Sequence, residues 1–386
     1  MNHLDRLDAV IIGAGLIGSA VAWRAGRLGL RTALADPGGP HAASPAAAGL
    51  LAPVSEAHYG EEGVLALNLA SARRYPEFIA DLESDAGSGA GSAGYRATGI
   101  LTVAHDRDDS AVLSDLAAFH QRLGLASELL TGAQCRDLEP LLAPGVHSGF
   151  LAAQDHVIDN RSLLATLHTA LERHNTVIHR QAVTELLVEG GAAVGVRLAD
   201  GTLLRAPQVV LAAGSWSNTI PGLPSGVLPA IRPVKGQILR LAVPADQRPF
   251  VSRAIFGLVR GRKVYLVPRE HGELVVGATS EEAGYDTEVT AGGVYGLLRD
   301  AHLLFPGLGE LPLPEISVGL RPCAADNAPV LGRTALPGLI AATGHYRHGV
   351  LLTPITADLI ADLLAGTELP DWATQFGPPR PDRTGR

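Results

Sequence analysis

A glycine-rich turn close to the N-terminus has the spacing of a phosphate-binding loop. The run "GAGLIG", residues 13–18, fits GxGxxG, follows an apolar strand-like segment and opens an apolar helix-like one. The first glycine permits a tight turn, the second lets the backbone approach a pyrophosphate, and the third lets the helix pack on the strand. Asp36, at the end of the next strand-like segment, would accept ribose hydroxyls. The pattern predicts a dinucleotide site and by itself does not separate FAD from NAD.

Two arginines framed by glycine or proline are the second set of residues that could do chemistry. Arg347 lies in "GHYRHGVLLTP", and Arg321 lies in "GLRP" after the apolar "EISVGL". A guanidinium binds a planar carboxylate through two parallel N–H···O bonds. The alternative for each arginine is an ion pair with a neighbouring acid such as Asp326. His345 and His348 lack a third ligand, so no metal site is predicted.

The composition limits the classes of function. A chain of 386 residues with 46% apolar and 18% charged residues predicts a globular α/β protein large enough for two domains. The net charge of −8 argues against a nucleic-acid partner. Cys135 and Cys323 form no CxxC pattern, so neither a disulfide nor a zinc site is expected. Because the sequence has neither a signal-peptide pattern nor an apolar run of about 18 residues, we expect a cytoplasmic protein without a membrane partner.

The elements that must position these residues follow from the apolar pattern. Residues 9–35 predict a strand, the glycine turn, a helix to about residue 28, and a second strand, which is a βαβ half-unit. Helices are expected at 110–123, at 159–174 with Asp159 or Asn160 as the cap, and at about 350–364. Residues 377–386 should form a loose tail. Further strands are expected at 100–104, 176–179, 184–189, 193–198, 208–213, 237–243, 263–268, 274–278 and 339–342.

A series of short motifs then points to one known family. In chain order they are "VIIGAGLIGSAVAWRAGRLG", "SPAAAGLLAP", "VVLAAGSWS", "PVKGQ", "YLVPR" followed by "VVGATSE", "GLRP" and "GHYRHGVLLTP". Together they resemble the D-amino-acid-oxidase-type family of FAD-dependent amine oxidases, and within it the glycine oxidases. The motifs extend from residue 10 to about residue 365, so the resemblance covers nearly the whole chain.

The resemblance implies a noncovalently bound FAD and a set of residues around it. Cys323 follows "GLRP", whereas the cysteine that tethers FAD in sarcosine oxidases would lie a few residues earlier. Val183 falls where a backbone group meets the adenine, and residues 345–351 fall where the chain passes the flavin ring. The implied FAD-binding residues are Gly13, Gly15, Leu16, Ile17, Gly18, Asp36, Pro37, Ala43, Ser44, Ala48, Gly49, Leu50, Val183, Gly214, Trp216, His345, Tyr346, Arg347, His348, Gly349, Val350 and Leu351.

The resemblance also implies the reaction. Arg321 and Arg347 match the two arginines that hold the substrate carboxylate, and Tyr265 of "YLVPR" matches a tyrosine whose hydroxyl helps. The expected activity is oxidative deamination of glycine, and also of sarcosine and small D-amino acids, by hydride transfer to the flavin. Dioxygen would reoxidise the flavin to give hydrogen peroxide beside the imine or 2-oxo acid and ammonia. The implied role is supply of the glycine imine for thiamine thiazole synthesis, in a homo-oligomer, commonly a tetramer.

Other interpretations stay open at this point. Phe256 lies near the place where the family often has a second tyrosine, so the preferred substrate is undecided. A D-amino-acid oxidase, a dehydrogenase that passes electrons to a quinone, and a flavin-binding protein without turnover are the alternatives.

The expected architecture is of the α/β (α+β) class, with a Rossmann-type FAD-binding domain and an inserted antiparallel β-sheet substrate domain. Residues 1–94, 157–222 and 319–386 would form the first domain, and residues 95–156 and 223–318 the second.

Overall fold

The structure is a computed structural model that describes residues 7–378. Its first element is the predicted βαβ unit, with β1 (Ala9–Ile12), α1 (Leu16–Arg27) and β2 (Thr32–Ala35). All residues of both strands are buried, and the strands pair in parallel. Residues 379–386 of the expected tail lie outside the described residues.

A six-stranded sheet extends this unit, in the order β18-β19-β12-β1-β2-β8. Its other strands are β8 (Val177–His179), β12 (Gln208–Leu211), β18 (Val330–Arg333) and β19 (Leu339–Thr343). Every pairing is parallel except that of β18 with β19. A mainly parallel sheet buries both faces of its central strands, which explains why β1 and β12 are almost wholly apolar and buried.

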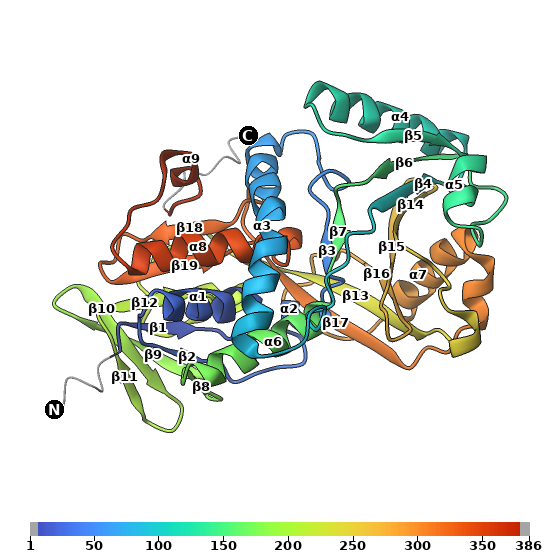
Figure 1. Cartoon of the computed structure of the whole chain (residues 1–386). Helices are drawn as coiled ribbons and strands as arrows, with labels where there is room; N and C mark the ends of the chain where they lie inside the picture. The colour runs from blue at the N-terminus through green and yellow to red at the C-terminus, as the bar shows by residue number, and fades with distance from the viewer. Residues whose placement is uncertain (1–6, 379–386) are drawn as a thin grey trace.

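Different layers cover the two faces of this sheet (Figure 1). On one face, an apolar core joins α1 to α3 (Glu62–Ala86), α6 (Asn160–Arg173) and α8 (Thr353–Leu364). On the other face, the sheet packs against a three-stranded antiparallel sheet in the order β11-β10-β9. The strands of that small sheet are β9 (Val183–Glu189), β10 (Ala192–Leu198) and β11 (Leu203–Arg205).

The second large sheet has eight strands in the order β17-β13-β16-β15-β14-β4-β6-β5. It is antiparallel apart from the β4–β14 pair. A separate apolar core lies between this sheet and α7, together with α5. The elements are β4 (Ile100–Ala104), α4 (Arg107–Arg122), β5 (Glu128–Thr131), α5 (Gly132–Leu138), β6 (Ser148–Ala152), β13 (Arg232–Ala242), β14 (Ala254–Val259), β15 (Arg262–Pro268), β16 (Glu273–Gly277), α7 (Ala291–Leu304) and β17 (Glu315–Cys323).

Short elements link the two large sheets. β3 (Leu50–Leu51) pairs with β7 (His156–Val157) between them. The remaining pieces are α2 (Ala43–Ala46), α9 (Asp371–Thr374) and the 3₁₀ turns η2 (Gly214–Thr219), η3 (Ala245–Gln247), η4 (Pro306–Glu310) and η5 (Tyr346–His348). None of the helices in the described part of the chain is both long and apolar enough to cross a membrane.

The expected fold class is confirmed, while some bounds differ. Asp159 caps α6, because its side chain accepts from the backbone N–H groups of Arg161 and Ser162. The C-terminal helix begins at Thr353 and not near residue 350, since η5 occupies the preceding turn. The domain division stays a prediction, and β17 crosses the boundary expected between residues 318 and 319.

Candidate active site

One cavity of about 750 Å³ extends from the six-stranded sheet to the eight-stranded sheet. Ile12 and Ala35 line it at one end, and Ile238, Phe256 and Tyr265 line it at the other. A cavity that joins two sheets in this way can hold an extended ligand and a smaller one beside it.

The glycine turn forms the first end of this cavity. Gly13 has φ +104°, and a Cβ there or at Gly18 would overlap a neighbouring backbone carbonyl. The first turn of α1 carries no acidic residue of its own, and its positive end faces the cavity beside the Asp36 carboxylate. Asp36 lies at the same end, where it accepts from the N–H of Ala14 at 2.5 Å and of Gly38 at 2.6 Å. The helix N-terminus and this close backbone approach suit a pyrophosphate, and the Asp36 carboxylate suits a ribose.

Most of the residues predicted to hold the cofactor line this cavity. Gly18, His348 and Leu351 do not: Gly18 packs on the carbonyl of Gly13, and the other two side chains are buried behind the wall. The predicted residues in the wall are Gly13, Gly15, Leu16, Ile17, Asp36, Pro37, Ala43, Ser44, Ala48, Gly49, Leu50, Val183, Gly214, Trp216, His345, Tyr346, Arg347, Gly349 and Val350.

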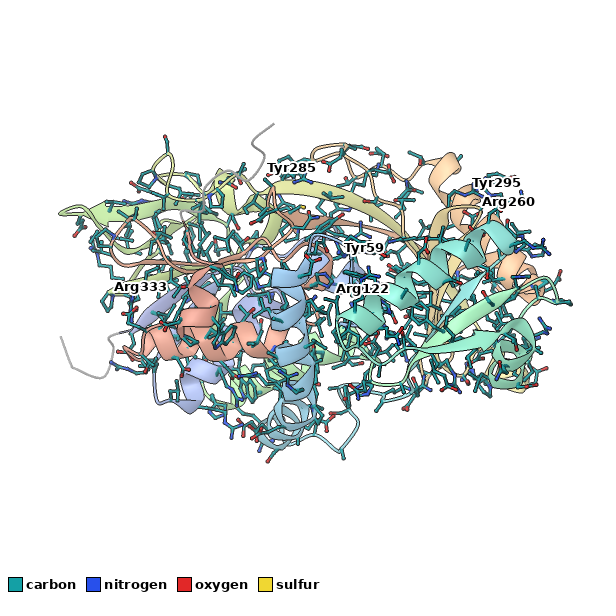
Figure 2. The ribbon with its side chains drawn as sticks, turned by 90° about the horizontal axis from the view of Figure 1, so that it is seen from above. Tyr59, Arg122, Arg260, Tyr285, Tyr295 and Arg333 are labelled. Atoms are coloured by element: carbon teal, nitrogen blue, oxygen red, sulfur yellow. The ribbon has the colours of Figure 1, made fainter. Side chains whose placement is uncertain are left out.

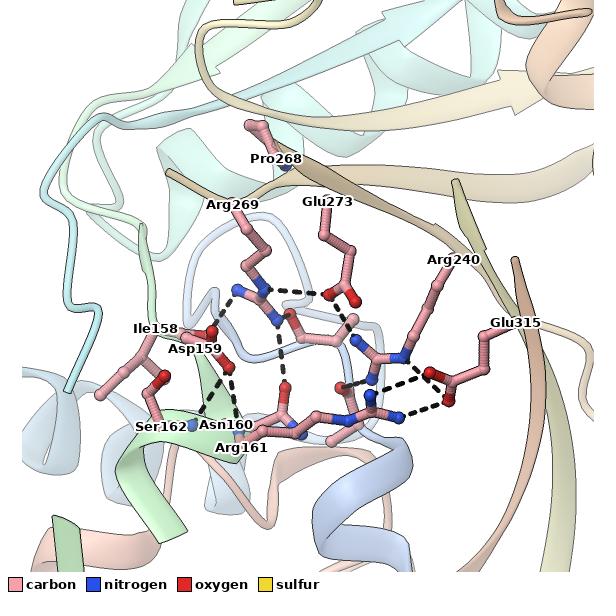
Figure 3. A network of polar contacts seen from close by, with 12 residues as sticks. Ile158, Asp159, Asn160, Arg161, Ser162, Arg240, Pro268, Arg269, Glu273 and Glu315 are labelled. Carbon is pink, nitrogen blue, oxygen red and sulfur yellow. Dashed lines mark hydrogen bonds and ion pairs between the residues drawn. The ribbon is translucent and has the colours of Figure 1, made fainter. Parts of the chain in front are cut away.

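A polar network holds the segment 44–49 in place (Figure 3). The guanidinium of Arg269 donates to the carbonyls of Ile158 and Ala48, both at 2.7 Å. Arg240, 1% exposed, donates to the carbonyl of Pro45 at 3.1 Å and to Glu273 at 2.6 Å. These arginines come from the eight-stranded sheet, so they tie that sheet to the cofactor segment. Neither arginine could be identified from the sequence as a partner of this segment, because each lies far from it in the chain.

Arg321 and Tyr265 lie at the second end of the cavity, each over a glycine. A Cβ at Gly236 would come within 2.5 Å of the Arg321 guanidinium, and one at Gly277 would overlap the Tyr265 hydroxyl. Arg321 Nη1 donates to the carbonyl of Thr279 at 3.0 Å, which fixes the direction of its planar group. The remaining donors of Arg321 and the Tyr265 hydroxyl are therefore placed to receive a carboxylate.

Arg347 lines the same end of the cavity and already has a carboxylate partner. Its Nη1 donates to Oε1 of Glu61 at 3.3 Å, and its Nη2 pairs with Oε2. Asn327 donates to the same Oε1 at 2.9 Å. Burial alone would lower the pKa of Arg347, but the carboxylates of Glu56 and Glu61 raise it. The acid that pairs with this arginine is 286 residues away in the sequence, so chain proximity could not reveal it.

The segment 52–61, between β3 and α3, adds three ionisable side chains that the sequence analysis missed. Glu56 and Glu61 both approach Arg347, and His58 Nε2 lies 3.2 Å from the Nζ of Lys263. Tyr59, labelled in Figure 2, anchors the segment on α4 by donating to the carbonyl of Asp115 at 3.1 Å. Burial lowers the pKa of His58 to about 4. The only signal in the sequence was the density of acids directly after "SPAAAGLLAP".

Comparison with known proteins agrees with this geometry. A family model described as FAD dependent oxidoreductase matches residues 8–363. The chain is 34% identical over 359 residues to the bifunctional protein ThiO/ThiG of Trichormus variabilis, covering 92% of this chain and 52% of that protein. It thus spans about half the length of the first curated relatives it matches.

Two further relatives match over nearly their whole length. The chain is 32% identical to the glycine oxidase of Pseudomonas putida, covering 94% of this chain and 95% of that protein. The crystal structure of glycine oxidase from Geobacillus kaustophilus superposes with a TM-score of 0.87 at 28% identity, covering 96% of this chain and 98% of that one. FAD is therefore the cofactor that the family match indicates. The chain belongs to the FAD dependent oxidoreductase family.

Proposed function

We propose that this protein is a FAD-dependent amino acid oxidase that deaminates glycine, and more weakly sarcosine and small D-amino acids. One observation carries the proposal: Arg321, Arg347 and Tyr265, from β17, η5 and β15, line the same cavity as the dinucleotide-binding turn. Three convergent donors for a carboxylate beside a flavin site are what an amino acid oxidase needs. The names of the Pseudomonas and Geobacillus relatives support glycine as the substrate.

The residues of this chain would act mainly by positioning. Arg321 and Tyr265 would take the substrate carboxylate first, because Arg347 is held by Glu61. FAD, when bound, supplies the hydride acceptor and returns the electrons to dioxygen. Binding of the carboxylate between fixed donors sets the distance of the α-carbon from that acceptor, and such orientation provides much of the rate.

We also propose how FAD is attached and where the protein acts. FAD would be noncovalent, because the Cys323 thiol is fully buried, contacts Asn327 at 3.2 Å and is absent from the cavity wall. Acid precipitation should then release all yellow colour into the supernatant. We further propose a cytoplasmic homo-oligomer that produces hydrogen peroxide and supplies glycine imine for thiamine thiazole synthesis.

Anaerobic titration of the purified holoenzyme tests the function. Glycine should bleach the flavin completely, sarcosine and D-alanine more slowly, and D-proline least. Readmission of air should yield one peroxide per flavin. Reduction of a quinone-like dye without peroxide would identify a dehydrogenase, and absence of bleaching by every one of these amino acids would overturn the proposed function.

A further inference from the structure

A partly buried acid lies at the substrate end of the cavity, apart from the arginines and the tyrosine. Glu56 lines the same cavity as Arg321, Arg347 and Tyr265. Its side chain is 17% exposed, and its carboxylate accepts no hydrogen bond from residues 7–378. An acid in such a place is costly to bury unless a ligand or a function compensates for it.

The backbone that carries Glu56 is anchored from behind. The carboxylate of Asp155, 0% exposed, accepts from the N–H of Val54 at 3.1 Å and of Ser55 at 2.7 Å. The N–H of Glu56 itself donates to the carbonyl of Ala52 at 3.0 Å. These bonds hold the backbone from which the side chain reaches the cavity wall, as a group that acts on a ligand requires.

Charged groups from several elements face this carboxyl. Burial raises its pKa to about 7, while the cations around it act in the opposite direction. Glu56 therefore exchanges a proton within the neutral range, which an ordinary glutamate does not. The groups that face Glu56 are Arg347 and His348 from η5, Lys263 and Tyr265 from β15, Arg321 from β17, and Asp155 from the β6–β7 connection. His58 and Glu61 of the same segment face Lys263 and Arg347 instead.

His348 provides a partner on the far side of Glu56. Its Nδ1 lies 3.6 Å from Oε2 of Glu56 and has no hydrogen-bond partner among the described residues, although His348 is only 2% exposed. Burial keeps the pKa of His348 well below its ordinary value, so the ring is neutral. A neutral Nδ1 can accept a hydrogen bond from Glu56 once that carboxyl is protonated.

We propose that Glu56 receives the ammonium group of the substrate and takes one proton from it before the α-carbon is oxidised. In this step a nitrogen–hydrogen bond breaks, its electron pair stays on the nitrogen, and an oxygen–hydrogen bond forms on Glu56. The carboxylate of an α-amino acid bound at Arg321 and Tyr265 leaves its ammonium group free to face another wall of the cavity. Glu56 is the acid in that wall with no hydrogen-bond partner. This inference rests on the proposed function.

Rapid anaerobic reduction of the holoenzyme by glycine tests the inference, with Glu56→Gln compared with the wild type and with Glu62→Gln. Glu62 is exposed and outside the cavity wall, so its variant should match the wild type. We expect reduction of Glu56→Gln to be about 100-fold slower at neutral pH and to recover as pH rises and free neutral amine appears. The wild type should lose rate as pH falls through about 7, whereas the loss in the variant should follow the fraction of neutral amine and begin at a higher pH.

Two further measurements separate proton transfer from a structural role. Glycolate has the carboxylate and no amine, so Glu56→Gln should bind it within about threefold of the wild type. Glu56→Asp keeps a carboxyl at a greater distance and should show an intermediate rate with the acidic limb retained. An unchanged rate and pH profile in Glu56→Gln, or equal weakening of glycine and glycolate, would overturn the inference alone. A wild type that no amino acid reduces would overturn the proposed function as well.

Discussion

At the scale of single residues, Arg347 is engaged before any substrate binds. Glu61 accepts from both terminal nitrogens of its guanidinium and is itself held by Asn327. A substrate carboxylate that uses Arg347 must therefore displace an internal one. The affinity of the site for a carboxylate then reflects the difference in free energy between two ion pairs, and not the strength of a single ion pair.

Replacing Glu61 by Gln should strengthen binding of carboxylate ligands. The competing charge is lost, and a charged hydrogen bond contributes about 1.5–3 kcal/mol, so glycolate should bind about tenfold more tightly. Flavin absorbance during titration measures the dissociation constant. Glu62→Gln serves as the control, and an unchanged or larger constant for Glu61→Gln would contradict the competition.

The glycine beneath Arg321 gives a second prediction at this scale. A Cβ at Gly236 would meet the movable guanidinium rather than backbone, so Gly236→Ala should fold normally and displace Arg321. We expect kcat/KM for glycine to fall about tenfold or more, mainly through KM, with the melting temperature little changed. Gly292→Ala in α7, with open space around its Cβ, is the matched control. A wild-type KM in Gly236→Ala would show that Arg321 does not hold the carboxylate.

At the scale of elements, the two sheets share responsibility for the cofactor segment. Residues 44–49 follow the six-stranded sheet in the chain, yet their carbonyls are bound by Arg240 and Arg269 from the eight-stranded sheet. Arg161, at the start of α6, also donates to the carbonyl of Pro45 at 3.0 Å and pairs with Glu315. Movement of either sheet would therefore alter the FAD pocket.

Arg269→Met should loosen this segment and weaken FAD binding. The substitution leaves the buried carbonyls of Ala48 and Ile158 and the side-chain oxygen of Asn160 without this donor, at a cost of about 1–3 kcal/mol for each unsatisfied group. The fluorescence of FAD released after dilution measures the loss of binding. Arg205→Met removes an exposed pair with Glu189 and should change FAD retention little. Equal retention in both variants would argue against the network's role.

At the scale of the whole molecule, buried histidines make stability depend on pH. His120 on α4 is 0% exposed, neither ring nitrogen has a hydrogen-bond partner in the described part of the chain, and its ring meets Phe150 edge to face at 5.3 Å. Burial lowers the pKa of His120 to about 4 and that of His345 to about 3. Because these histidines have a higher pKa in the unfolded chain, the unfolded chain binds protons at a higher pH than the folded one. The contribution of the two neutral histidines to stability is therefore complete above about pH 6.5 and is lost as pH falls towards 4.

His120→Leu should remove one of these contributions. Relative to the wild type, the free energy of unfolding of the variant should rise by up to about 1.4 kcal/mol for each pH unit below 6.5, because leucine has no proton to bind. Denaturant unfolding at neutral and acidic pH measures this difference in unfolding free energy between the two proteins. Glu56 and Asp155 affect stability with the opposite sign, but equally in both proteins, so their contributions cancel in the difference. The exposed His271→Asn is the control. A difference that is independent of pH would contradict the argument.

The features that could be predicted from the sequence are those that depend on residues close together in the chain. The βαβ unit, several strands of each large sheet and the Asp159 cap follow from apolar alternation and short-range capping, whereas β5, β6, β14 and β18 were not predicted. The long helix α3 was missed, as was the start of β13 at Arg232, five residues before the expected 237. Those residues are stabilised by packing against distant elements, which a local pattern does not record.

The sequence by itself determined the dinucleotide turn, the fold class and the motifs that carry two arginines and a tyrosine. Only the tertiary structure decided that Arg347 pairs with Glu61, that Arg321 and Tyr265 lie over Gly236 and Gly277, and that Glu56 faces the same cavity. The physical reason is that a glycine turn is specified by the φ of adjacent residues, whereas charge pairing depends on distance in space. Segments far apart in the chain meet at this cavity, so its electrostatics arise only when both sheets have folded.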